Sequence, residues 1–152
     1  MKGRFARNKK IVFEGPKGAN KYLSNQFSST FFEDGINWPS VEHYFQAYKF
    51  AGNPYVETVR TAATPDKAKE YGQTRKIKLR KDWEQEKDSI MRNGMRLKFS
   101  QNTKLRDALI DTGNAKIIFE GNDDYWGTGP NGKGQNNMGE NLMAIRDELK
   151  NL

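Results

Sequence analysis

One stretch of this chain carries most of the information about its fold: Trp38-Pro39-Ser40-Val41-Glu42-His43-Tyr44-Phe45-Gln46-Ala47-Tyr48-Lys49-Phe50. Proline is favoured at the first position of a helix, so we expect a helix from Pro39 to about Ala51. Its apolar positions form a stripe that would face the core, namely Val41, Tyr44, Phe45 and Tyr48.

The same helix would carry a polar stripe. Gln46 and Lys49 lie one and two turns after Glu42, and this spacing places the three side chains on one face. A carboxylate and an amine beside aromatic side chains can act as general base and as electrophile or nucleophile. An ordinary Glu–Lys surface pair beside a core stripe has the same spacing, and spacing alone favours that simpler interpretation.

Outward from this helix, local signals predict several further elements. Asp34-Gly35 lies between aromatic and apolar residues, which favours a hairpin turn. Thr64-Pro65-Asp66 is a typical helix start, and Gly72 is its natural stop. We expect a longer helix capped by Asp82, and another from about Thr103 to Thr112, closed by Gly113.

The two ends of the chain complete the expected architecture. Short strands are predicted over 10–14 and 116–120, and helical spacing continues through Leu142, Ile145 and Leu149 to the C-terminus. Helices dominate and the strands are few and scattered. We therefore predict an α+β fold with a helical majority, in a single domain over residues 1–152.

Composition narrows the classes of function. The 152 residues contain 26 Lys and Arg against 19 Asp and Glu, a formal net charge of +7. Such a field attracts phosphorylated metabolites, dinucleotides or nucleic acid, although it also suits a plain solvated surface. The basic segment 75–81 has the same two interpretations, and a solvated connector is the simpler one.

Other residue types exclude some chemistry. Cysteine is absent, so disulfides, thiolate metal sites and a Cys nucleophile are excluded. His43 is the only histidine, which argues against a Ser-His-Asp arrangement and a histidine metal site. No stretch approaches the ~18 apolar residues of a membrane span. The apolar group 11–13 is too short for a signal peptide, and we expect a cytoplasmic protein.

A glycine-rich loop over 122–136 is the second chemically dense segment. Its glycine spacing resembles both a dinucleotide-binding fingerprint and a phosphate-binding loop. The dinucleotide fingerprint needs a βαβ unit, which is not expected here, and the phosphate-binding loop needs Ser or Thr after Lys133, where this chain has Gly134. A looser hypothesis is that backbone amides and a helix start near Met138 hold phosphate, while Tyr125 and Trp126 stack on a base. The alternative is a long surface loop with an anchoring Trp.

Four segments together resemble one family, the NADAR family of NAD- and ADP-ribose-associated N-glycosidases. They are the stretch 38–50, Leu79-Arg80-Lys81-Asp82-Trp83 with Met91 and Lys98-Phe99, Asn122-Asp123 with Tyr125-Trp126-Gly127, and Gly132-Lys133-Gly134-Gln135-Asn136 with Gly139 and Leu142-Met143. Leu23-Ser24-Asn25 also matches. The resemblance covers about Ile11 to Leu149, in the family's order.

The resemblance implies hydrolysis of ribosyl N-glycosidic bonds without metal or organic cofactor. Family members act on early riboflavin-pathway ribosylaminopyrimidine phosphates, or remove ADP-ribose from guanine bases in nucleic acid. The implied catalytic residues are Glu42, Asp123 and Lys49, the last as a possible Schiff-base lysine. The implied substrate-binding residues are Trp83, Trp126, Asn25, Asn136, Tyr44 and Gln46.

General chemistry agrees with this assignment. Cleavage of an N-glycosidic bond builds positive charge at the anomeric carbon, which a nearby carboxylate stabilises while it orients or deprotonates water. Which of Glu42 and Asp123 is the base stays open, as does the oligomeric state. The competing hypothesis is a non-catalytic module that binds ADP-ribose or nucleic acid, which the charge and the aromatic loop would suit equally well.

Overall fold

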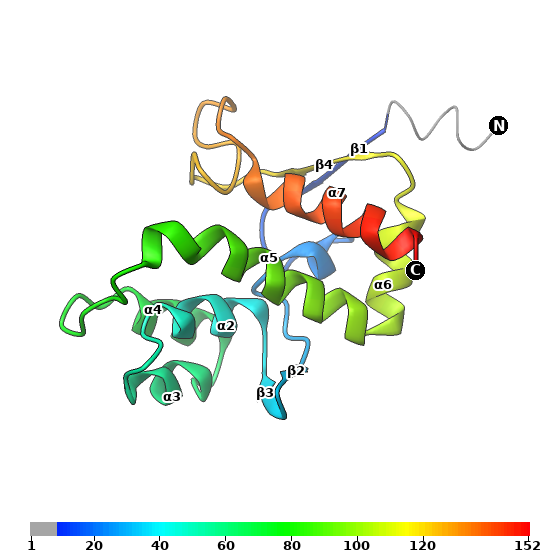
Figure 1. The fold of residues 1–152 in the computed structure, drawn as a ribbon. Coiled ribbons are helices and arrows are strands. Elements are labelled where there is room, and N and C mark those ends of the chain that lie inside the picture. The colour runs from blue at the N-terminus through cyan, green and yellow to red at the C-terminus, as the bar shows by residue number, and fades with distance from the viewer. Residues whose placement is uncertain (1–8) are drawn as a thin grey trace. The chain divides into compact units, whose positions relative to one another are not determined.

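A computed structural model of the chain describes residues 9–152 (Figure 1). In chain order the elements are β1 Lys10–Phe13, the 3-10 turn η1 Lys21–Leu23, β2 Phe31–Glu33, β3 Ile36–Trp38, α2 Val41–Tyr48, α3 Tyr55–Arg60, α4 Pro65–Gly72, α5 Trp83–Gln101, α6 Thr103–Asp111, β4 Lys116–Phe119 and α7 Asn137–Lys150. The predicted α+β class with a helical majority is confirmed. The basic residues near the start, Lys2 to Arg7, lie outside the described part.

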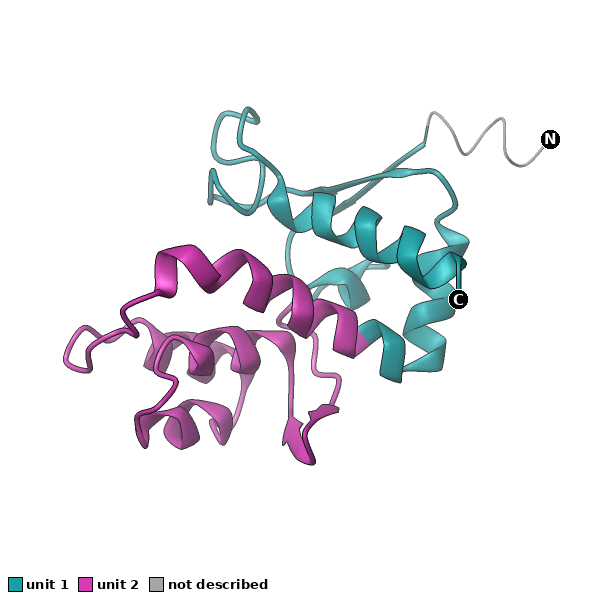
Figure 2. Cartoon of the chain, viewed as in Figure 1, with its two compact units in different colours: residues 1–24, 99–152 teal, residues 25–98 magenta. Residues whose placement is uncertain are grey.

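The chain divides into two compact units (Figure 2). Unit 1 combines residues 1–24 with 99–152, and unit 2 is the continuous segment 25–98. Helix α5 begins in unit 2 and its last residues belong to unit 1. The expectation of a single domain over 1–152 stays a prediction.

Unit 1 is built on two parallel strands. β1 pairs with β4 in a register that places Ile11 beside Ile117 and Phe13 beside Phe119. The rings of Phe13 and Phe119 stack with centroids 5.1 Å apart. Helix α7 packs against β4 and α6, and its apolar positions at the predicted spacing, Leu142, Ile145 and Leu149, are buried. Ile11 and Ile117 are buried too, so the pair of strands and α7 share this unit's core.

In unit 2, a hairpin leads directly into α2. β2 and β3 are antiparallel, and the turn residues Asp34 and Gly35 both have positive φ (53° and 80°), as a type I′ turn requires. The predicted hairpin is thereby confirmed. The predicted start of the following helix at Pro39 is wrong. Ser40 has extended backbone and its side chain accepts a hydrogen bond from the amide of His43, so α2 begins at Val41 and Pro39 precedes the cap.

The remaining helices of unit 2 enclose α2. Thr64 caps α4 through its side chain and Pro65 takes the first helical position, as predicted. Helices α3 and α4 both pack against α2 and against each other. Gly94 of α5 lies against the ring of Tyr44, where an added Cβ would be 2.7 Å from Cδ1. None of the helices within 9–152 is long and apolar enough to cross a bilayer.

Candidate active site

The polar stripe of α2 is real, and it faces α4. Gln46 Nε2 donates a hydrogen bond of 2.7 Å to Glu42 Oε2, which fixes one carboxylate oxygen. One turn further on, Lys49 is buried and its Nζ donates to the carbonyl oxygen of Gly72 at 3.3 Å. Glu42, Gln46 and Lys49 are therefore brought together as the spacing predicted, and their environment is not that of an ordinary surface pair.

Burial changes the acid–base character of this stripe. Desolvation raises the pKa of Glu42, against the opposing effects of the Gln46 hydrogen bond and of the Lys69 and Lys49 charges. Desolvation, followed by repulsion from Arg75, lowers the pKa of Lys49 to about 8. A carboxyl and an amine whose pKa values move toward neutral pH are suited to proton transfer and nucleophilic attack. The exposed cations Lys69 and Arg75 are thus near enough to influence the site electrostatically.

Aromatic side chains lie beside Lys49. Its Nζ lies 5.9 Å from the centroid of the Phe45 ring. The Phe45 ring packs at 5.0 Å and 57° against the ring of Trp83, which is buried at the first turn of α5. The Lys49 carbonyl accepts the amide of Arg80 at 2.8 Å, and this bond ties the connector 73–82 to the end of α2. Trp83, a predicted substrate-binding residue, thus belongs to the same cluster as Lys49.

Asn25 reaches the first turn of α2 through its backbone. Its carbonyl accepts the amide of Glu42 at 3.1 Å, one of the first-turn donors that a helix leaves without an internal partner. Its side chain is buried and contacts Met91 Sδ at 3.1 Å. The structure therefore places Asn25 directly beside the catalytic candidate, and its role toward a ligand stays a prediction.

Tyr44 is directed to a different network. Its hydroxyl donates to Glu33 Oε2 at 3.0 Å, the Tyr48 hydroxyl donates to Glu33 Oε1, and Asn93 Nδ2 donates to both Glu33 Oε2 and the Tyr44 oxygen. One carboxylate thus joins β2, α2 and α5. Burial first, with contributions from the Glu33 carboxylate, raises the pKa of Tyr48 to about 12. Substrate binding by Tyr44 remains a prediction, but the contacts of its hydroxyl are those of a supporting network.

His43 takes a structural position. It is buried, with Nδ1 2.7 Å from Ser40 Oγ and Nε2 3.0 Å from the carbonyl of Ala62. A carbonyl only accepts, so Nε2 carries the proton and Nδ1 accepts from the Ser40 hydroxyl. Burial lowers the pKa of His43 despite the Ala62 hydrogen bond. In the neutral ring this bonding satisfies both nitrogens, and it links α2 to the segment after α3.

We therefore expect His43 to make stability depend on pH in a defined direction. Because the folded pKa lies below the ordinary 6.5, the unfolded chain takes up the proton first as pH falls. The free energy of unfolding contributed by His43 is complete above pH 6.5 and declines below it. Urea unfolding between pH 5 and 8 should show a steeper decline for the parent chain than for His43→Gln. A His43 ring that titrates at or above 6.5 by NMR would refute this prediction.

The other predicted residues lie in unit 1, on the loop and at the start of α7. Asp123 Oδ1 accepts the amides of Tyr125 and Trp126, both at 2.7 Å, so its carboxylate organises the loop's first turn. The Tyr125 and Trp126 rings meet edge to face at 4.8 Å. Catalytic and binding roles for Asp123 and Trp126, and the pairing of Asp123 with Glu42, stay predictions.

Asn136 is buried and has left-handed backbone, with φ 55°. Its amide bridges β4, since Nδ2 donates to the carbonyl of Ile117 at 3.0 Å and Oδ1 accepts the amide of Phe119 at 2.9 Å. Gly139 packs tightly against the same strand: a Cβ added to Gly139 would be 2.1 Å from the Ile117 carbonyl oxygen. The contacts of Asn136 fasten the loop to the strand, and a role in positioning the ligand remains a prediction.

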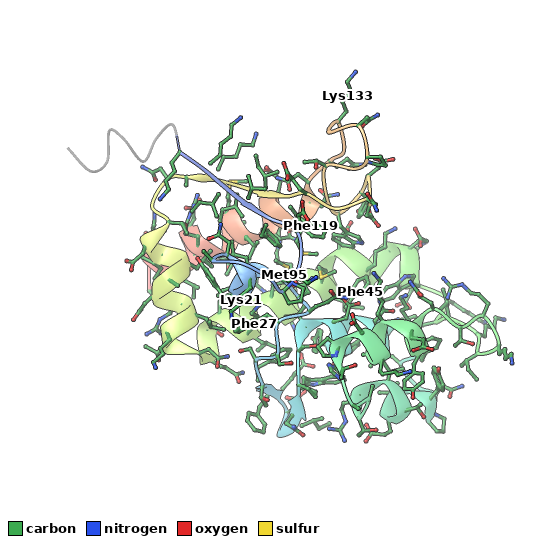
Figure 3. All side chains as sticks on the ribbon, turned by 180° about the vertical axis from the view of Figure 1, so that it is seen from behind. Lys21, Phe27, Phe45, Met95, Phe119 and Lys133 are labelled. Carbon is green, nitrogen blue, oxygen red and sulfur yellow. The ribbon has the colours of Figure 1, made fainter. Side chains whose placement is uncertain are left out.

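The phosphate hypothesis for the start of α7 is not supported. The amides of Asn137 and Met138 donate to the carbonyls of Tyr125 and Trp126, at 3.3 and 2.9 Å, so these donors are already used within the loop. Lys133 projects from the outer tip of the loop (Figure 3), unlike the lysine of a phosphate-binding loop. Residues 9–152 contain no cluster of three or more His, Asp or Glu side chains suited to a metal ion.

Several structurally important residues of unit 2 could not be assigned a role from the sequence. Glu33 and Asn93 gave no local signal, because their partnership joins a hairpin to a helix distant in sequence. Gly72 was noticed only as a helix stop. Lys98 lies in one of the segments that match the family, but no role was predicted for it. Its side chain is fully buried, with Nζ 5.6 Å from the centroid of the Phe27 ring, and burial lowers the pKa of Lys98 to about 7.

Comparison with known proteins identifies the class to which this site belongs. Residues 12–150 match the NADAR domain. The N-glycosidase YbiA of Shigella boydii is 45% identical over 117 residues, covering 76% of this chain and 73% of that protein. A riboflavin biosynthesis protein of Vibrio vulnificus is 34% identical, covering 92% of this chain and 38% of that protein. The NMR structure of Escherichia coli YbiA superposes with a TM-score of 0.86 at 38% identity, covering 95% of this chain and 86% of that one.

The chain belongs to the NADAR domain family. It is an enzyme of the N-glycosidase class, a hydrolase acting on N-glycosyl compounds. This finding favours the catalytic hypothesis over the non-catalytic binding module.

Proposed function

We propose that the chain hydrolyses the bond between a ribose carbon and a base nitrogen in a phosphorylated or ADP-ribosylated substrate, with Glu42 as the central catalytic residue. The observation that carries this proposal is the held carboxylate of Glu42, fixed by Gln46 at 2.7 Å and neighboured by a buried amine. A fixed negative charge in a poorly solvated place stabilises developing positive charge more strongly than one in water.

The proposed reaction begins with departure of the base. As the base leaves with the electron pair of the C–N bond, the anomeric carbon becomes an oxocarbenium-like centre, and the Glu42 carboxylate stabilises it. Water then adds to that carbon and gives up a proton, while the departing base nitrogen gains one. Asp123, the second predicted carboxylate, would bind ribose hydroxyls or share the proton transfer. The products are the sugar with its 1-hydroxyl and the base, which is free in the first substrate class and still part of the strand in the second.

Two substrate sources share this chemistry. The net charge of +7 suits any phosphorylated ribosyl ligand, and Lys69 and Arg75 place positive charge near the Glu42–Lys49 stripe. The Vibrio vulnificus relative, named a riboflavin biosynthesis protein, supports ribosylaminopyrimidine phosphates. The same charge suits ADP-ribosylated guanine in nucleic acid, which would have to be single-stranded or flipped out. A cytoplasmic location fits either source and stays a prediction.

A direct competition of substrates tests the proposal. The protein is incubated with a ribosylaminopyrimidine phosphate and with a single-stranded oligonucleotide carrying ADP-ribosyl guanine, and the released products are measured by mass spectrometry. We expect release of the pyrimidine from the first substrate or of ADP-ribose from the second, with kcat/KM at least about 100-fold above the Glu42→Gln variant. Release from the oligonucleotide that falls steeply with salt would indicate phosphate-backbone contacts. Failure to cleave either substrate would overturn the proposed substrate class.

A further inference from the structure

Gly72, the last residue of α4, lies against the polar stripe of α2. Gly72 is buried, and a Cβ built on it would lie 2.0 Å from Gln46 Oε1 and 2.7 Å from both Cβ and Cδ of Gln46. Real Cβ atoms essentially never come within 3.0 Å of a heavy atom to which they are not linked through neighbouring bonds. The side chain of Gln46 therefore fills the space that any other residue at position 72 would need.

Glycine is required here by space and not by backbone conformation. The glycines with positive φ among the described residues are Gly18, Gly35, Gly52, Gly113, Gly129 and Gly132, and Gly72 is not one of them. Alanine would consequently adopt the backbone of Gly72 without strain, and the three atoms nearest its Cβ would all belong to Gln46. This separates the role of Gly72 from that of an ordinary helix-stop glycine.

Gln46, which fills this space, holds the catalytic carboxylate. Its Nε2 donates to Glu42 Oε2 at 2.7 Å. Its Oε1, turned toward Gly72, is buried and has no hydrogen-bond partner among the described residues. No hydrogen bond among the described residues holds that half of the amide, and it lies in the space beside the Cα of Gly72. A buried acceptor without a partner is costly, which is consistent with an arrangement kept for function.

The same glycine also fixes the amine. The Gly72 carbonyl is the acceptor for Lys49 Nζ at 3.3 Å. One residue therefore contacts two of the three members of the stripe: its Cα carries no side chain where Gln46 lies, and its carbonyl oxygen accepts from Lys49. A shift of α4 away from α2 would move the carboxylate clamp and the amine together.

We propose that Gly72 is a positioning residue of the active site, which sets the relative placement of the Glu42 carboxylate and the Lys49 amine through Gln46 and through its own carbonyl. Its catalytic consequence rests on the function proposed above, whereas its effect on Lys49 and Gln46 does not. A misplacement of about 1 Å costs about 100-fold in rate when catalysis depends on orientation.

The test compares Gly72→Ala with Gly94→Ala. The second variant is a matched control, because its Cβ would meet Tyr44 Cδ1 at 2.7 Å and so crowds α2 at the Tyr44 ring, away from Glu42, Gln46 and Lys49. We expect Gly72→Ala to lower kcat by about 10-fold to 100-fold with a smaller change in KM. Titration of Lys49 by NMR should move from about 8 in the parent chain toward the ordinary 10.5 in Gly72→Ala, and stay near 8 in Gly94→Ala.

The Lys49 titration needs no substrate, so it separates this inference from the proposed function. If the parent chain cleaves neither substrate but Lys49 shifts in Gly72→Ala alone, the proposed function fails and the positioning role stands. If Lys49 titrates identically in Gly72→Ala and in the parent chain, the positioning role is overturned whatever the activity.

A double-mutant cycle with a variant of Gln46 tests the proposal even if Gly72→Ala alone does not fold. In Gln46→Gly all three Gln46 atoms that an added Cβ would meet (Oε1, Cβ and Cδ) are absent, so Gly72→Ala should cost much less there than in the parent chain. Unfolding in urea and kcat are measured for all four members of the cycle. Equal costs in both backgrounds, or a double variant that is also unfolded, would show that Gly72 does not act through Gln46 and would overturn the proposal.

Discussion

The Glu42→Gln variant is expected to fold like the parent chain and to release base at least about 100-fold more slowly. The carboxamide has nearly the shape of the carboxylate, and its oxygen can still accept the hydrogen bond from Gln46 Nε2. Only the negative charge that we propose to face the anomeric carbon is lost. Because burial penalises that charge in the parent chain, the variant should unfold at an equal or higher urea concentration.

The dependence of activity on pH is a second test of the role of Glu42. The Glu42 pKa is raised above its ordinary 4.5, so the active carboxylate is lost at a higher pH than for an exposed glutamate. Activity of the parent chain should therefore fall as pH decreases through that raised value. The residual activity of Glu42→Gln should lack this decline, since its side chain does not titrate.

Glu70→Gln is the matched control for Glu42→Gln. It removes the same charge from α4 in the same unit, but Glu70 is exposed and pairs with Lys67 at 3.1 Å on the surface. Exposed ion pairs of this kind contribute little to the free energy of unfolding. We therefore expect the rate of base release by Glu70→Gln to lie within about twofold of that of the parent chain. Comparable rates for Glu42→Gln and the parent chain on a substrate that both bind would remove Glu42 from the centre of the mechanism.

Local sequence signals predicted those parts of the fold that depend on neighbouring residues. Asp34-Gly35 forms its turn because both residues tolerate positive φ, and Thr64-Pro65 starts α4 because cap and proline act within one turn. At Pro39 two local rules compete. The Ser40 side chain bonds the amide of His43, so the serine takes the cap and moves the helix start past the proline.

Features that depend on distant partners could not be predicted in this way. The parallel pairing of β1 with β4 joins the two ends of the chain, and no local pattern specifies which strands pair. Helix α3 was missed because its six residues give too short a periodic signal.

The site shows the same division between local and distant information. The helical spacing of Glu42, Gln46 and Lys49 placed them on one face, yet only the structure supplies the α4 residue against which they lie. Gly72 could be read from the sequence as a stop but not as the neighbour of Gln46. The Glu33 network around Tyr44 was likewise invisible, because its carboxylate comes from the hairpin.

Borohydride added during turnover is expected to trap a ribosyl adduct on Lys49. After the base departs, the neutral amine attacks C1 of the opened ribose, water leaves, and the resulting C=N bond accepts hydride to become a stable C–N bond. The burial of Lys49 favours a neutral amine. Its Nζ is held by the Gly72 carbonyl and lies over the Phe45 ring. Mass spectrometry of peptides should locate the added mass at Lys49.

The rate of trapping should follow the neutral fraction of this amine. Its pKa is lowered to about 8, so the rate should rise with pH to about 8 and level off above it. At pH 6 it should be about 100-fold below the plateau, because the neutral fraction falls tenfold for each pH unit. Lys49→Arg keeps the positive charge but cannot form the C=N bond, and Lys69→Met removes an exposed neighbouring charge as a control. We expect the adduct to disappear in Lys49→Arg and to persist in Lys69→Met; full base release by Lys49→Arg, with no adduct in the parent chain, would show that Lys49 acts only through its charge.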